Sequence, residues 1–169
     1  MSVPNQSMFV SIDGTHYSIN EPRPFNKKWY SHKLNGPGLT YEIGLCIRTG
    51  QVVWAFGGLP AGDFPDLRMA KMAFVTFLEN GEKALADKGY RDSNYFIFPN
   101  KDFPDNSQHK RLMARHETIN GRMKSFHVLS QKFVRKLHHH KSIFDACIRI
   151  LQLQMTSGEM CLGSFEQFY

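Results

Sequence analysis

Alternating and helical patterns of hydrophobic residues divide the chain into a strand-rich first half and a helical second half. Residues 8–13 predict a first strand, on which the side chain of Asp13 alternates with apolar neighbours. Residues 39–47 are apolar at every second position, which predicts a half-buried strand. A turn at residues 49–50 leads into an apolar run at residues 52–56, so these two strands are expected to form a hairpin.

The middle of the chain predicts one helix and two further strands. The helix is expected to be capped by Asp63 or Asp66 and to end at residues 80–81, an Asn-Gly pair. Short apolar runs at residues 83–86 and 95–98 predict a fourth and a fifth strand. Because a helix crosses over before the fourth strand, we expect an α/β fold with a five-stranded mixed sheet flanked by helices.

Helical spacing of apolar residues begins near Lys110 and continues from residue 112 to residue 137. Glu117 and Lys124 are seven residues apart, so they share a face that neighbours this apolar side. A last helix is expected over residues 142–155. The second half of the chain therefore supplies the helices that cover the sheet.

The length of 169 residues and the hydrophobic content of 41% predict one folded domain. We expect a disordered segment at residues 1–7, a domain at residues 8–158 and a tail at residues 159–169. No apolar run approaches the length of a membrane span and no signal-peptide pattern is present, so we expect an intracellular protein without a membrane partner. Three scattered cysteines without CxxC spacing predict reduced thiols.

The net charge of +6 is concentrated in one segment. Residues 106–144 contain nine Lys and Arg residues and a single acid, Glu117, which gives this segment a charge of +8. This stripe is either a solvated face or a track for phosphates, and the scarcity of acids favours the track. Residues 138–140 are three consecutive histidines, which point in different directions on a helix and predict a solvated surface rather than a metal site.

Carboxylates at strand ends are the candidate chemistry. Asp87 follows the buried fourth strand, where a desolvated carboxylate needs a cation or hydrogen-bond donors. Asp13 would lie beside Asp87 if the first and fourth strands are neighbours, and Glu117 would approach from the helix. Three such acids suit a pair of divalent cations. The alternatives are a turn role for Asp13, and an ion pair between Glu117 and Arg115 or Arg122.

Four blocks of sequence, taken in order, carry a resemblance to a known family. They are Ile12–Thr15, Trp29–Lys33 with Gly36–Glu42, Ala86–Tyr90, and the helix around Glu117. In this order the chain resembles the DDE transposases of the Harbinger type and their bacterial insertion-sequence relatives, over about residues 8–158. The resemblance implies a ribonuclease-H-like core and a nuclear location if the source is eukaryotic.

The resemblance also implies roles for individual residues. Asp13, Asp87 and Glu117 correspond to the family's catalytic acids, which would hold two Mg²⁺ or Mn²⁺ ions. Lys124 matches the lysine seven residues after the glutamate, whereas Met113 stands where some relatives have an arginine. The residues expected to contact DNA are Lys88, Arg115, Arg122, Lys124, Lys132 and Arg135.

The first hypothesis is therefore a metal-dependent DNA endonuclease and strand-transfer domain. A catalytically inactive module that binds nucleic acid or protein is the alternative, and a ribonuclease-like enzyme is a weaker third. Only 12 residues precede Asp13, so we expect no N-terminal DNA-binding domain of its own. The protein could also bind a separate DNA-binding partner protein or form a homo-oligomer, and the sequence does not decide between these alternatives.

Overall fold

The computed structural model describes residues 8–99 and 107–159. The long strands are β1 (Val10–Ser18), β3 (Gly36–Cys46) and β4 (Val52–Pro60). β3 pairs antiparallel with both of the others, and its register with β1 joins Val10 to Cys46 at one end and Ser18 to Gly38 at the other. Gly50, with φ of 75°, makes the turn between β3 and β4, which confirms the predicted hairpin.

Two short parallel strands extend the sheet beyond β1. β5 (Ala84–Leu85) pairs parallel with β1, and β6 (Phe96–Ile97) pairs parallel with β5. The strand order is therefore β4-β3-β1-β5-β6, a mixed sheet in which the first and fourth predicted strands are neighbours. This order and these directions are compatible with a ribonuclease-H-like core.

A sixth strand was not predicted from the sequence. β2 (Tyr30–Ser31) pairs antiparallel with the start of β3 and follows the 3-10 helix η1 (Lys27–Trp29). Its two residues are too few to give a periodic signal. The sheet thus has six strands rather than five.

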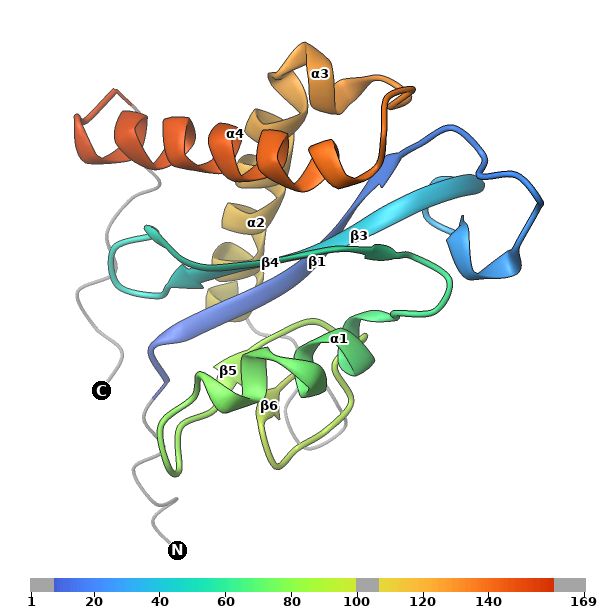
Figure 1. Ribbon diagram of the computed structural model, residues 1–169. Coiled ribbons are helices and arrows are strands. Elements are labelled where there is room, and N and C mark those ends of the chain that lie inside the picture. Colours follow the sequence, from blue (N-terminus) through green and yellow to red (C-terminus); the bar gives the residue numbers. More distant parts are fainter. Residues whose placement is uncertain (1–7, 100–106, 160–169) are drawn as a thin grey trace, which may run out of the picture.

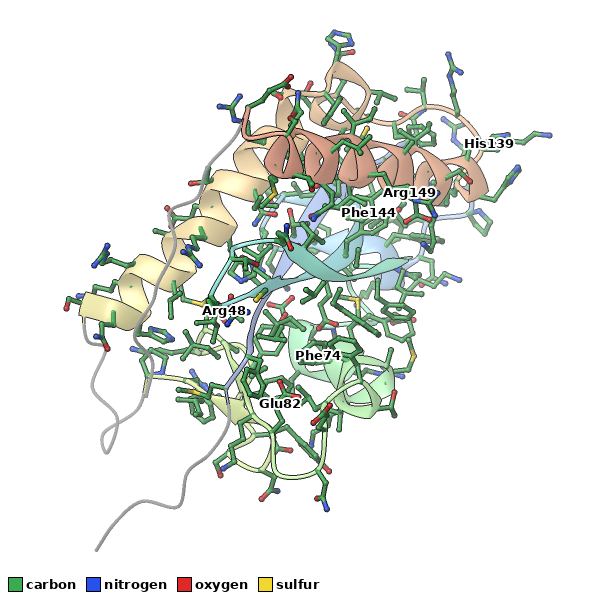
Figure 2. All side chains as sticks on the ribbon, turned by 90° about the vertical axis from the view of Figure 1, so that its left-hand side faces the viewer. Arg48, Phe74, Glu82, His139, Phe144 and Arg149 are labelled. Atoms are coloured by element: carbon green, nitrogen blue, oxygen red, sulfur yellow. The ribbon has the colours of Figure 1, made fainter. Side chains whose placement is uncertain are left out.

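Helices cover both faces of the sheet (Figure 1). The helices α2 (Ser107–Ser125), α3 (His127–Ser130) and α4 (His138–Thr156) pack on one face, against the larger core cluster. The helix α1 (Asp66–Met72) lies on the other face, where it shares a second core cluster with side chains of β5 and β6. Figure 2 shows Phe144 of α4 and Phe74, after α1, on opposite sides of the strands.

β3 is buried on both faces, which corrects the half-buried strand expected from its alternation. Tyr41 and Ile43 lie in the core under α4, whereas Thr40 and Glu42 point to the opposite face and are also fully buried. Alternation of apolar residues along β3 indicates only one buried face. The other face is buried by segments distant in sequence, including Tyr90, and the local pattern of β3 carries no information about them.

The helix around α1 is shorter than predicted, and neither Asp63 nor Asp66 caps it. Pro65 occupies the N-cap position without a side-chain cap, and Asp66 begins the first turn. The helix ends at Met72, and a 3-10 helix, η2 (Phe74–Thr76), follows. This segment contains β-branched and aromatic residues, which are weak helix formers, and it turns the fully buried Phe74 into the core.

The apolar pattern from residue 112 to residue 137 is not one continuous helical side. α2 ends at Ser125, and Phe133 lies in an extended segment that forms an isolated parallel bridge with Ile19. A helix-like spacing therefore arose from separate segments that fill the same core. None of the helices in residues 8–99 and 107–159 is long and apolar enough to cross a membrane.

α4 begins four residues earlier than predicted, so the histidine run lies in its first turn. His138 and His139 are exposed, whereas His140 is buried and its Nδ1 lies 2.7 Å from the hydroxyl of Tyr41. Burial lowers the pKa of His140 to about 4. His140 is thus a neutral core residue, which corrects the expectation of a solvated surface for all three histidines.

Candidate active site

Asp13 lies near the middle of the sheet, on β1 between β3 and β5. Its side chain is partly buried and points to the sheet face that α2 covers. There the amide of Asn120 donates a hydrogen bond of 3.4 Å to Asp13 Oδ2. The strand and the helix thus meet at this carboxylate.

Asp87 lies beside Asp13 because their strands run parallel. The paired residues on the two strands are Ser11 and Leu85, and each aspartate is two residues further along its chain. The backbone N–H of Gly89 donates a hydrogen bond of 2.7 Å to Asp87 Oδ1, which holds the carboxylate in a tight turn. The negative charge of Asp87 raises the pKa of Asp13, as expected for neighbouring acids.

Asp66, expected from the sequence only as a helix cap, is a third acid at this place. Its carboxylate lies directly against Gly14, where a Cβ atom would have no space. A Cβ on Gly89 would lie 3.2 Å from Asp66 Oδ2 and 2.9 Å from Asp87 Oδ1. The two glycines therefore allow the first turn of α1 to approach both predicted aspartates.

Lys33 supplies the positive charge of this cluster. Its Nζ lies 3.2 Å from Asp66 Oδ2 and 3.4 Å from the carbonyl oxygen of Gly14. Burial raises the pKa of Asp13 to about 6, the charge of Lys33 opposes this rise, and the charges of Asp87 and Asp66 add to it. Among these described side chains, the three carboxylates outnumber the single ammonium group, so the cluster is not electrically balanced.

Glu42 lies beneath the cluster and is completely buried. Burial raises its pKa to about 8, the charges of Asp66 and Asp13 raise it further, and the Tyr90 hydroxyl and Trp54 indole N–H lower it. In the described part of the chain, its carboxyl oxygens have no well-aligned hydrogen bond. Glu42 is therefore a neutral acid at pH 7, because that pH lies below its pKa.

Glu117 lies on α2 with an exposed side chain, and the structure does not bring it into contact with the aspartates. Within residues 8–99 and 107–159, no three His, Cys, Asp or Glu side chains converge closely enough to hold a metal ion. Glu117 nevertheless precedes Asn120 by three residues and Lys124 by seven. Asn120 contacts Asp13. The part of α2 next to Glu117 therefore reaches β1.

Most residues predicted to contact DNA are exposed, with one exception. Arg115 is 4% exposed, and its Nη1 donates a hydrogen bond of 2.6 Å to the carbonyl oxygen of Ile47. Its guanidinium therefore fastens α2 to the end of β3 rather than facing solvent. The exposed members of the predicted set are Lys88, Arg122, Lys124, Lys132 and Arg135.

Some residues of the cluster that were not predicted lie close to sequence motifs. Lys33 and Glu42 stand inside blocks that carry the family resemblance, and Asn120 lies one turn from Glu117 on the same helix. Asp66 lies in a segment that carries no motif, and its position opposite Gly14 depends on how α1 packs. Only the folded chain identifies it.

Comparison with known proteins gives a family match. The model of a family described as DDE superfamily endonuclease matches residues 12–152. The chain is 25% identical over 149 residues to a probable transposase for insertion sequence element IS702 from Microchaete diplosiphon, which covers 79% of this chain and 52% of the relative. The chain thus spans about half the length of that relative. No solved structure matches it significantly.

Proposed function

Because the chain belongs to the DDE superfamily endonucleases, we propose that it is the catalytic domain of a transposase that cuts and joins DNA phosphodiester bonds. Asp13, Asp87 and Glu117 are the proposed catalytic acids. The observation that supports this most is the pairing of β1 with β5, which sets Asp13 and Asp87 side by side under the helix that carries Glu117.

The residues at this place fit a hard divalent cation such as Mg²⁺ or Mn²⁺. The side chains offer carboxylate oxygens, which such ions prefer, and Asp66 Oδ1 is buried without a hydrogen-bond partner among the described residues. A cation there would also oppose the effects of burial and of the neighbouring carboxylates, which together raise the pKa of Asp13. Asp13 and Asp87 would hold the metal, with Glu117 as the third ligand. When bound, two such ions would activate the attacking oxygen and stabilise the leaving oxygen.

The protein's own side chains orient these groups. Asn120 donates a hydrogen bond to Asp13 Oδ2 and the backbone of Gly89 donates one to Asp87 Oδ1, so each carboxylate is held in place by a neighbour. Glu117 is exposed on α2 and reaches the aspartates only by a change of side-chain or helix position. A divalent cation on Asp13 and Asp87 would favour that change, because it would attract both the Glu117 carboxylate and the phosphate oxygens of bound DNA.

Positive side chains around the acids support DNA as the substrate. Lys124 lies on the Glu117 face of α2, and Lys88 directly follows Asp87. Lys132 and Arg135 continue the exposed basic surface between α3 and α4. Such residues neutralise phosphates and release counterions, which makes binding depend on salt. A separate DNA-binding partner and a homo-oligomer remain our proposals for how DNA ends are selected and paired.

A second candidate function is a nucleic-acid-binding or protein-interaction module without turnover. The separation of Glu117 from the aspartates favours this candidate, because a protein that does not catalyse the reaction does not need the three acids to converge. This candidate retains the basic surface and predicts binding that is indifferent to metal.

Cleavage of supercoiled plasmid DNA with Mn²⁺ tests the first function. We expect metal-dependent nicking by the parent and its loss in Asp87→Asn and Glu117→Gln. Asp145→Asn removes the same charge from an exposed pair with Lys141 on α4 and is expected to leave nicking unchanged. Metal-independent DNA binding without nicking by the parent would contradict the enzyme and support the module.

A further inference from the structure

A pocket of about 560 Å³ opens beside the acid cluster. It lies between the segment that leads into β2 and the loop before α1, and it shares the side chains of Lys33 and Asp66 with the cluster. A volume of this size falls within the ~300–1,000 Å³ typical of sites for small ligands. An occupant of the pocket would therefore contact Lys33 and Asp66, whose charges act on Asp13.

The pocket wall presents aromatic rings to solvent. Phe25 is 63% exposed, an unusual state for a phenylalanine that lines a hollow surface. The hydroxyl of Tyr30 donates a hydrogen bond of 2.7 Å to Asn35 Oδ1, and its ring meets the edge of His32 at 5.2 Å between centroids. The tyrosine ring is therefore held in place while the phenylalanine ring is available to a ligand.

The backbone of the pocket is also fixed. The N–H of Gly62 donates a hydrogen bond of 2.8 Å to the carbonyl oxygen of Lys28, which ties the loop before α1 to η1. A Cβ on Gly62 would lie within 2.5 Å of the carbonyl oxygen of Lys27. The two walls are thus packed together where Gly62 meets Lys27 and Lys28.

The charged side chains that line the pocket are compatible with an anionic group. They are Lys27, Lys33 and Asp66, and because Asp66 pairs with Lys33, Lys27 supplies the surplus positive charge. His16, also in the wall, is neutral because burial lowers its pKa to about 4. A ligand with a planar ring system and a phosphate could stack on the exposed aromatic rings and also pair with the lysines.

We propose that this pocket holds an unpaired nucleobase of the DNA strand, with a phosphate next to it on Lys27 or Lys33. The base stacks on Phe25 and Tyr30, a contact open to any base because every base has a π face. Extraction of one base would bend the strand over Asp66 and present the neighbouring phosphodiester to Asp13 and Asp87. This proposal rests on the proposed function, since it takes DNA as the substrate.

Binding of defined DNA probes without metal tests the proposal separately from catalysis. The probes are a blunt 20-base-pair duplex, the same duplex with a three-nucleotide overhang that contains 2-aminopurine, and the duplex with an abasic overhang. We expect the base-containing overhang to bind about tenfold more tightly than the other two, the order of effect of one stacked base. Stacking is also expected to quench the fluorescence of 2-aminopurine.

Two phenylalanines make a matched comparison. Phe25→Ala is expected to abolish both the tenfold preference and the quenching, while Phe9→Ala, at a side chain 56% exposed outside the pocket, is expected to keep both. Tyr30→Phe keeps the ring and is expected to retain the preference, and circular dichroism verifies folding of each variant.

The possible results separate this proposal from the function on which it rests. Equal affinity for all three probes would overturn the base pocket and leave DNA binding intact. Tight binding of the abasic overhang would assign the pocket to phosphate alone and would also overturn the base assignment. Failure of the parent to bind even the blunt duplex would overturn DNA as the substrate, and the pocket proposal with it.

Discussion

Lys33 and Asp66 form an ion pair of 3.2 Å that closes one side of the acid cluster. The lysine comes from the segment after β2 and the aspartate from the first turn of α1, so the pair joins two elements that are distant in sequence. The same ammonium lies 3.4 Å from the carbonyl oxygen of Gly14, next to Asp13. The Lys33 ammonium therefore acts on the same carboxylates that a metal ion would bind, and the two cations would compete for them.

Replacement of Lys33 by methionine is expected to raise the pKa of Asp13 above its value of about 6. The ammonium is the strongest influence that opposes the effect of burial on this carboxyl group. NMR titration of the Asp13 carboxyl carbon measures the change. Lys71→Met, which removes a cation paired with Asp92, is the control and is expected to leave the Asp13 titration in place.

Affinity for Mn²⁺ is expected to fall as pH decreases through about 6. A metal binds the deprotonated carboxylate and must displace the proton that Asp13 retains at acidic pH. Calorimetric titrations at pH 7.5, 6.5 and 5.5 measure the loss, expected to approach tenfold per pH unit below the pKa. Constant affinity across this range would exclude Asp13 as a ligand.

Glu42→Gln is expected to stabilise the protein at alkaline pH. The folded-state pKa of about 8 lies above the ordinary 4.5, so the parent loses stability as pH rises between these values. Glutamine has no proton to lose and avoids this cost, which we place at about 2 kcal/mol at pH 8 after allowance for relaxation. Urea unfolding at pH 5 and pH 8 measures the free energy of unfolding. Destabilisation that is equal at both pH values would contradict the explanation.

The opposite pH dependence is expected from His140. Its folded-state pKa of about 4 lies below the ordinary 6.5, so the folded state loses stability as pH falls from 6.5 toward 4. His140→Leu removes this dependence, although the Tyr41 hydroxyl loses its partner at a cost of about 1 kcal/mol. Thermal unfolding from pH 7 to pH 4 compares the slopes, and His139→Leu, at an exposed position, is expected to match the parent.

Phe144→Ala is expected to destabilise the fold by about 3–5 kcal/mol, because it opens a cavity in the core. The ring is fully buried and stacks on Tyr41 with 4.0 Å between centroids. Val134→Ala, at a side chain 68% exposed, is the control and is expected to change stability by less than about 0.5 kcal/mol. Chemical denaturation measures both.

The sequence predicted the sheet better than the helices around it. The alternation from residue 39 to residue 47 identified β3, and the short run before Asp87 identified β5, because strand periodicity is local. The predicted start of α4 was wrong by four residues, and the first turn that was missed contains His140, which is buried and contacts Tyr41, a residue 99 positions away. A tertiary contact of this kind leaves no mark on local pattern.

The candidate site divides in the same way. Asp13 and Asp87 follow from strand ends and from the family resemblance, and the pairing of their strands agrees with that prediction. Asp66 and Glu42 depend on which segments cover the second face of the sheet, and sequence periodicity carries no such information. The role of Glu117 remains a prediction.

The short length of β5 affects how often its backbone hydrogen bonds open. Asp13 is carried by a strand whose nine residues are all in register with β3, whereas Asp87 follows a two-residue strand with one register pair to β1. Amide hydrogen exchange should therefore be slow around Asp13 and fast around Asp87. Local opening of the β1–β5 pairing would separate the two aspartates, so we expect a ligand that bridges them to slow amide exchange throughout β5 as well as at its own contacts.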